Sequence, residues 1–256
     1  MEPENTPGEA DRLWTKLRAV SPARIGLPRT GSSVATSEQL AFRLAHAEAK
    51  DAVHDRIDPD ALLAALRSRG LDAILAASMA PDRTLYLERP DLGRRLDDAS
   101  RAALKGAARG GDLVFVLADG LSAQAVTSHA LPLIDATLPA LRREGWRIGP
   151  AVVVERGRVA IGDEIGACLG ASLVAMLIGE RPGLTSAKSL GAYLTWAPKI
   201  GRSDAERNCL SNIRPEGMSY REAASRLGYL CGEARRRQLT GVGLKDEFNP
   251  NVIEAR

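Results

Sequence analysis

Three short loops could bring chemistry to one place, because each combines a glycine with charged or polar side chains. They span residues 119–122, 155–159 and 179–183, and each directly follows a stretch with the pattern of a buried strand. Glycine lets the backbone approach a ligand, and open parallel sheets bind ligands beyond the carboxyl ends of their strands. The loops together therefore predict a ligand site at that edge, although a glycine turn after a strand is also ordinary topology.

Side chains suited to catalysis are few. The histidines are His46 and His54 on one predicted helix and His129 on another, and we interpret them as structural or solvent-exposed. The sequence has no GxGxxG after a strand and no GxxxxGK[ST], which argues against an ordinary dinucleotide or P-loop enzyme. It also lacks HExxH, CxxC and GxSxG, so neither a protein-held zinc nor a serine hydrolase of that type is expected.

The three cysteines differ in their surroundings. Cys168 and Cys231 lie in helical patterns and are predicted to be small core residues. Cys209 lies in DAERNCLSNIRPEG, residues 204–217, which lacks apolar periodicity and is predicted to be a loop dense in hydrogen-bonding side chains. Cys209 is therefore the cysteine expected near a ligand. Three cysteines fit a reducing cytoplasm better than a disulfide scaffold.

The composition is that of an ordinary globular protein. Of 256 residues, 45% are hydrophobic and 26% are charged, which excludes wholesale disorder. The net charge of +3 arises from 35 basic and 32 acidic residues that are well interspersed, so no nucleic acid partner is expected. Apolar runs such as 173–178 are too short to span a bilayer, and the acidic first residues do not resemble a secretory signal.

The elements that position these loops are predicted to alternate between strand and helix. This alternation favours an α/β fold with a Rossmann-like parallel sheet and flanking helices over residues 111–256. Strands are expected near 113–118, 148–154, 172–180 and 193–196, and helices near 122–133, 138–145, 161–169 and 219–237.

The preceding sequence is predicted to be helical. Residues 1–35 form an N-terminal extension and arm, with an amphipathic helix near 10–20 followed by a Pro- and Gly-rich stretch. Residues 36–110 form a helical region, in which Thr36 and Gln39 make a capping box and Asp58-Pro59 opens a second helix.

Six segments in a fixed order resemble the small subunit of adenosylcobalamin-dependent ethanolamine ammonia-lyase. The resemblance extends from residue 23 to about residue 245, whereas the first 20 residues show no clear match. The segments are ARIGLPRTG (23–31), LAHAEAKDAV (44–53), LYLERPDLGRRL (85–96), VLADGLSAQAV (116–126), IGERPGL (178–184) and DAERNCLSNIRPEG (204–217).

This resemblance implies a part in radical catalysis. The complete enzyme converts ethanolamine to acetaldehyde and ammonia through an adenosyl radical, and the hard chemistry belongs to the cofactor. A large subunit with a TIM barrel supplies the substrate-binding and catalytic side chains, in a hetero-oligomer of several large and small subunits. This chain would then be inactive alone and close over the cofactor at the subunit interface. The expected location is the cytoplasm, within or outside a bacterial microcompartment.

The family's cofactor contacts carry over to Val159, Glu180 and Cys209, and no catalytic or metal-binding residue is assigned. Val159 and Glu180 also follow predicted strands. The peripheral amides of cobalamin donate hydrogen bonds that a carboxylate can accept, whereas Cys209 would act through its thiol or its backbone. The 111–256 domain is thus expected to bind cobalamin. In this family the cofactor's own benzimidazole stays on cobalt, which agrees with the absence of a DxHxxG motif.

Two other functions stay open at this point. One is a non-catalytic module that binds cobalamin without turnover. The other is a nucleotide-dependent α/β oxidoreductase, against which the missing GxGxxG counts.

Overall fold

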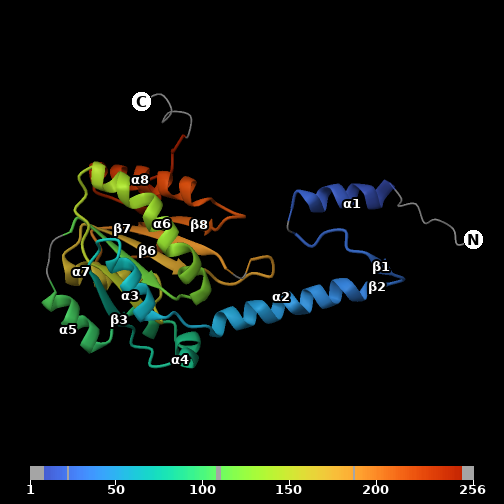
Figure 1. Ribbon diagram of the computed structural model, residues 1–256, viewed down its shortest axis with the longest axis horizontal. Coiled ribbons are helices and arrows are strands. Elements are labelled where there is room, and N and C mark those ends of the chain that lie inside the picture. The colour runs from blue at the N-terminus through green and yellow to red at the C-terminus, as the bar shows by residue number, and fades with distance from the viewer. Residues whose placement is uncertain (1–8, 22, 108–110, 187, 250–256) are drawn as a thin grey trace, which may run out of the picture.

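The chain folds into an α/β body with a long helical arm (Figure 1). The computed structural model describes residues 9–21, 23–107, 111–186 and 188–249. The body is built on one six-stranded sheet whose strands lie in the order β3-β5-β4-β6-β7-β8. The strand bounds are β3 Ala73–Ala77, β4 Leu113–Ala118, β5 Ala151–Glu155, β6 Leu173–Gly179, β7 Leu190–Trp196 and β8 Asn208–Ile213.

The sheet is mixed, whereas the prediction was a parallel Rossmann-like sheet. β3, β5, β4 and β6 run parallel, but β7 pairs antiparallel with β6 and β8 pairs antiparallel with β7. The reason is the connection between β6 and β7, which is a loop at one edge without the helix that a parallel crossover needs. The α/β class with flanking helices is confirmed, and the purely parallel arrangement is wrong.

Two strands of the six-stranded sheet lie where none was expected. β3 falls within the region predicted to be helical and pairs in parallel with β5. β8 falls within the segment that was predicted to be a loop, so Cys209 is a strand residue. In β8 only Leu210 and Ile213 are buried, and this sparse pattern hid the strand. The 36–110 region therefore contributes to the sheet as well as to its helical cover.

Helices cover both faces of the sheet, and β4 shows how its sequence serves both. Leu113, Phe115 and Leu117 belong to one core cluster, while Val114 and Val116 belong to another on the opposite face, as the two-residue strand period requires. The first cluster lies under α3 (Pro59–Arg67), α6 (Ala123–Arg143) and α8 (Tyr220–Arg237), and the second lies under α5 (Asp98–Gly106) and α7 (Ile161–Leu169).

Several helix starts and ends can be compared with those predicted from the sequence. Asp58 accepts a hydrogen bond from the Ala61 backbone N–H at 3.0 Å and opens α3 as predicted. α7 ends at Gly170 in the left-handed conformation, also as predicted. The capping box at Thr36 is wrong, because α2 (Thr36–His54) begins after Ala35 with no side-chain cap. α6 is one continuous helix rather than two pieces, since its apolar face is buried along its whole length.

The arm extends away from the body (Figure 1). It consists of α1 (Glu9–Ala19), the small hairpin of β1 (Arg29–Thr30) and β2 (Ser33–Val34), and α2. Among the described residues of α2 only Ala52 is buried. Large apolar side chains of the arm are consequently exposed, namely Leu13, Trp14, Leu17, Val20, Val34, Leu40, Phe42 and Leu44.

Short elements complete the body. α4 (Arg83–Glu88) and the 3₁₀ turn η1 (Leu92–Arg94) follow β3. The 3₁₀ turns η2 (Asp204–Glu206) and η3 (Gly241–Gly243) flank β8 and α8 in the sequence. None of the described helices is both long and apolar enough to cross a membrane.

Candidate functional site

The three predicted loops meet in one cavity at the carboxyl ends of the parallel strands. They converge because β5, β4 and β6 are neighbours in the sheet. The cavity has a volume of about 420 Å³. The loops contribute Gly120, Leu121, Arg158, Val159, Gly179, Glu180 and Arg181 to its lining, which Tyr86, Ile178 and Tyr193 complete.

Glycines bring two of these loops into direct contact. Gly120 has a φ of +55°, and a Cβ atom there would overlap the Gly179 carbonyl oxygen. A Cβ atom on Gly179 would in turn overlap the Ser122 carbonyl oxygen. The Leu121 backbone N–H donates to the Gly179 carbonyl at 3.0 Å. These glycines therefore serve the packing of loop against loop, which agrees with the ordinary strand-to-turn topology that the sequence analysis had kept open beside a ligand site.

Glu180 lies just after β6 and ties that strand to β8. Its carboxylate accepts hydrogen bonds from the Ser211 hydroxyl at 2.5 Å, from the Asn212 backbone N–H at 3.1 Å and from the Ser189 hydroxyl. A carboxylate has roughly four acceptor sites, so one remains for a ligand. The Glu180 carboxylate is thus held in place by the protein and can still accept a hydrogen bond from a ligand in the cavity.

Cys209 reaches the cavity indirectly. It faces Tyr193 in the register between β7 and β8, and the two side chains are hydrogen-bonded. Burial raises the pKa of the Cys209 thiol above its usual range, and burial likewise raises the pKa of Tyr193. The structure therefore brings Val159 and Glu180 together with Tyr193 in one cavity lining, whereas Cys209 is outside that lining and lies beside Tyr193 on the neighbouring strand.

Val159 lies where two cavities adjoin. It lines the first cavity and also a second one of about 600 Å³, and Arg158 and Tyr193 are shared in the same way. Its side chain packs against the core cluster that α7 covers. Val159 is therefore a fixed apolar contact at the border of both cavities.

Tyr86 supports the floor of the site and was not predicted. It is fully buried, and its hydroxyl donates to the Gly157 carbonyl at 3.0 Å. The guanidinium of Arg83 lies 4.7 Å from the centre of its ring and that of Arg158 lies 4.2 Å away. Both arginines are thereby held by cation–π contacts. Tyr86 lies in the LYLERPDLGRRL segment. The resemblance of that segment to the family was the one signal in the sequence that could have pointed to Tyr86.

Asp119 belongs to the first loop and contacts the same part of the site as Tyr86. Its carboxylate accepts from the Gly157 backbone N–H at 3.2 Å and from Arg83 at 3.3 Å. Burial raises the pKa of Asp119 to about 6, against the opposing effect of Arg83. Asp119 therefore links the first loop to the second beneath the cavity.

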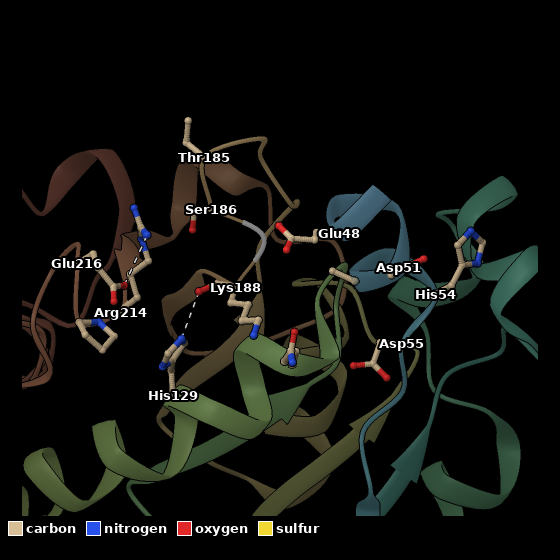
Figure 2. A pocket seen from close by; sticks show the side chains of 13 residues that line it. Glu48, Asp51, His54, Asp55, His129, Thr185, Ser186, Lys188, Arg214 and Glu216 are labelled. Atoms are coloured by element: carbon tan, nitrogen blue, oxygen red, sulfur yellow. Dashed lines mark hydrogen bonds and ion pairs between the residues drawn. The ribbon is translucent and has the colours of Figure 1, made fainter. Parts of the chain in front are cut away.

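A third cavity, of about 830 Å³, is lined in part by Thr185, Ser186 and Lys188 (Figure 2). The acidic residues Glu48 and Asp51 come to it from α2, and Asp55 comes from the C-cap of that helix. His129 stands opposite them, with Nδ1 2.7 Å from the Tyr220 hydroxyl and Nε2 3.2 Å from the Lys188 carbonyl oxygen. Burial lowers the pKa of His129.

His129 is accordingly a structural residue with both ring nitrogens occupied. His46 and His54 lie together on α2, as predicted. Within the described ranges, no group of three or more His, Cys, Asp or Glu side chains is placed to hold a metal ion. Cys168 and Cys231 are buried, as predicted, and Cys209 is exposed.

The fold and the cavities define an α/β protein with an open site at the carboxyl ends of its parallel strands. The family model described as ethanolamine ammonia-lyase light chain (EutC) matches residues 11–245. The chain belongs to this family of ethanolamine ammonia-lyase small subunits, and it is therefore part of a lyase.

Individual relatives cover almost the whole chain. The ethanolamine ammonia-lyase small subunit of Pseudomonas fluorescens (strain SBW25) is 53% identical over 249 residues, which are 96% of this chain and 90% of that one. The small subunit of Azotobacter vinelandii is 56% identical over 238 residues, with 91% and 88% covered. That of Xanthomonas campestris pv. campestris is 53% identical over 255 residues, with 98% and 93% covered.

Proposed function

We propose that this chain, together with a large subunit, binds adenosylcobalamin and supports the radical deamination of ethanolamine to acetaldehyde and ammonia. The observation that carries the proposal is the cavity that Val159 and Glu180 both line, together with Tyr193, which pairs with Cys209 on the neighbouring strand. The resemblance had named Val159, Glu180 and Cys209 as cofactor contacts. Two of these residues, Val159 and Glu180, line a single cavity of the fold.

The chemistry of the donor set fits this cofactor. Cobalamin presents peripheral amides around an apolar corrin. Glu180 has an acceptor site left over, and Val159 and Tyr193 offer apolar surface beside it. When bound, the cofactor supplies a cobalt–carbon bond that breaks homolytically. The residues of this chain would hold and orient it.

Catalytic side chains are assigned to the large subunit. Apart from one carboxylate that already accepts three hydrogen bonds, the titratable side chains of the cavity lining are two arginines and two tyrosines. Arginines do not release protons at neutral pH, and burial raises the pKa of both tyrosines. A general acid or base would need a pKa near the working pH. The isolated chain is therefore expected to have no lyase activity.

Reconstitution tests the proposal. The chain should co-purify with the large subunit, and the complex should release acetaldehyde from ethanolamine only when adenosylcobalamin is added. The chain alone, with the same cofactor, should release none. A complex that binds the cofactor without ever forming product would favour the non-catalytic cobalamin module. Turnover of a nucleotide substrate by the lone chain would favour the oxidoreductase.

A further inference from the structure

His129 is a buried residue that the proposed function does not use. It lies on α6 and is 8% exposed. Its Nδ1 lies 2.7 Å from the hydroxyl of Tyr220, the first residue of α8, and its Nε2 lies 3.2 Å from the Lys188 carbonyl oxygen, shortly before β7 (Figure 2). The ring therefore joins α6 to two other parts of the chain.

These two partners define the protonation of the ring. A carbonyl oxygen can only accept, so Nε2 carries the proton and donates to Lys188. Burial lowers the pKa of His129 and so favours the neutral ring, in which Nδ1 has no proton and accepts from the Tyr220 hydroxyl. Tyr220 thus favours the ring orientation in which Nε2–H reaches Lys188.

The residue after Lys188 contacts Glu180 twice. Ser189 is buried, and its carbonyl accepts from the Glu180 backbone N–H at 2.9 Å. Its hydroxyl donates to the Glu180 carboxylate. The position of Ser189 therefore affects both where the Glu180 backbone lies and how its carboxylate is oriented.

The ladder between β6 and β7 ends just before these residues. Its last register pair is Gly179 with Leu190. Lys188 and Ser189 lie beyond that pair, so contacts outside the ladder help to fix their positions. The hydrogen bond from His129 to the Lys188 carbonyl is such a contact, and it comes from a helix packed on the sheet.

We propose that His129 is a positioning residue for Glu180: its Nε2–H holds the Lys188 carbonyl, which keeps the Ser189 hydroxyl in place to orient the Glu180 carboxylate. This inference rests on the proposed function, in which that carboxylate accepts a hydrogen bond from adenosylcobalamin. His129 does not line the first cavity, so it acts through Ser189. An acceptor that is oriented before binding need not be ordered on binding, and this raises affinity.

Two substitutions separate the two hydrogen bonds of the ring. The amide nitrogen of Gln is as many bonds from Cβ as Nε2 of His, so His129→Gln can still donate to Lys188. The amide nitrogen of Asn corresponds to Nδ1, so His129→Asn keeps a partner for Tyr220 and loses Lys188. If His129 only joined α6 to α8 through Tyr220, Asn would be the milder change. Positioning through Lys188 makes Gln the milder one.

The first measurement is a spectroscopic titration of the assembled complex with adenosylcobalamin. His129→Asn should weaken binding about three- to tenfold, whereas His129→Gln and Tyr220→Phe should stay within about twofold of the wild type. The second is hydrogen exchange in the complex without cofactor. The Glu180 amide should exchange faster in His129→Asn than in the wild type or His129→Gln, while the amides of β4 keep their rates.

The matched control is His54→Asn, since His54 is exposed and lines the third cavity as His129 does. It should leave both measurements unchanged. Equal losses of affinity in His129→Asn and His129→Gln, or no loss in His129→Asn, would overturn the inference. Faster exchange throughout the sheet in His129→Asn would also overturn it, because His129 would then stabilise the fold as a whole. A wild-type complex that does not bind adenosylcobalamin would contradict the proposed function itself.

Discussion

Cys209 illustrates how single residues act through their neighbours in this protein. Sequence reasoning placed it near a ligand, and it is the exposed one of the three cysteines. Its thiol is hydrogen-bonded to Tyr193, which lines the cavity. That pairing depends on the register between β7 and β8, which join residues sixteen positions apart. The sequence could therefore indicate Cys209 as a residue near a ligand, but it could not indicate that Tyr193 pairs with it.

Alkylation should modify Cys209 alone in the folded chain. Cys168 and Cys231 are buried and should not react with iodoacetamide. Although Cys209 is exposed as a residue, partial withdrawal of its thiol from water raises the pKa, so little thiolate forms at neutral pH. The labelling rate should therefore increase as the pH rises past the usual thiol value of about 8.5. Mass spectrometry of peptides labelled at several pH values measures this.

Cys209→Ser is the control and should leave the native chain unlabelled. Labelling at Cys168 or Cys231 before unfolding would contradict the structure. A labelling rate that stops increasing below about pH 8 would show that the thiol has no raised pKa.

At the scale of elements, the sequence predicted the middle of the sheet and missed its edges. β4 and β6 are buried throughout and β5 nearly so, so each appears as a continuous apolar run. β3 and β8 are the outermost strands of the sheet. Edge strands commonly carry polar residues that discourage pairing with other chains, and their apolar signal is correspondingly weak. The three loops were found because they follow central strands, whereas the strand that holds Cys209 was not.

The buried Asp163–Arg207 pair links α7 to the start of β8. Arg207 also donates to the Thr195 hydroxyl at 3.0 Å and to the Arg202 carbonyl at 2.9 Å. Asp163→Asn should lower the free energy of unfolding by about 3–5 kcal/mol, since it leaves a buried guanidinium without its counter-charge. Urea unfolding followed by circular dichroism measures the change.

Asp204→Asn provides the comparison. Asp204 contacts the same arginine, but its side chain is 91% exposed. Its replacement should cost less than about 1 kcal/mol, as is usual for an exposed ion pair. Equal losses for the two variants would mean that the Asp163–Arg207 pair does not hold these elements together.

The whole molecule combines a packed body with an arm that the body barely covers. α2 buries Ala52 only, and the guanidinium of Arg83 binds the Val53 carbonyl at 2.6 Å near its end. The rest of the arm exposes apolar side chains on α1 and α2. Such a surface is typical of a contact with another protein, and we expect assembly with the large subunit to cover it.

Removing residues 1–50 should therefore leave the body intact. The truncated chain keeps Ala52 and Val53, and its thermal unfolding midpoint should stay within a few degrees of the full-length value. Its recovery with the large subunit should fall. A large drop in the midpoint would show that the arm stabilises the body, and undiminished recovery would show that it does not contribute to assembly.

The measurement that tests the central claim most directly is the affinity of the assembled complex for adenosylcobalamin when Glu180 is replaced. Glu180→Ala should weaken binding by about 1–3 kcal/mol, the usual effect of removing one partner of a buried hydrogen bond, while Glu233→Gln on α8 should leave it unchanged. An unchanged affinity for Glu180→Ala in a folded, assembled complex would contradict the account, because the cofactor would then lie outside the cavity that Glu180 and Val159 share.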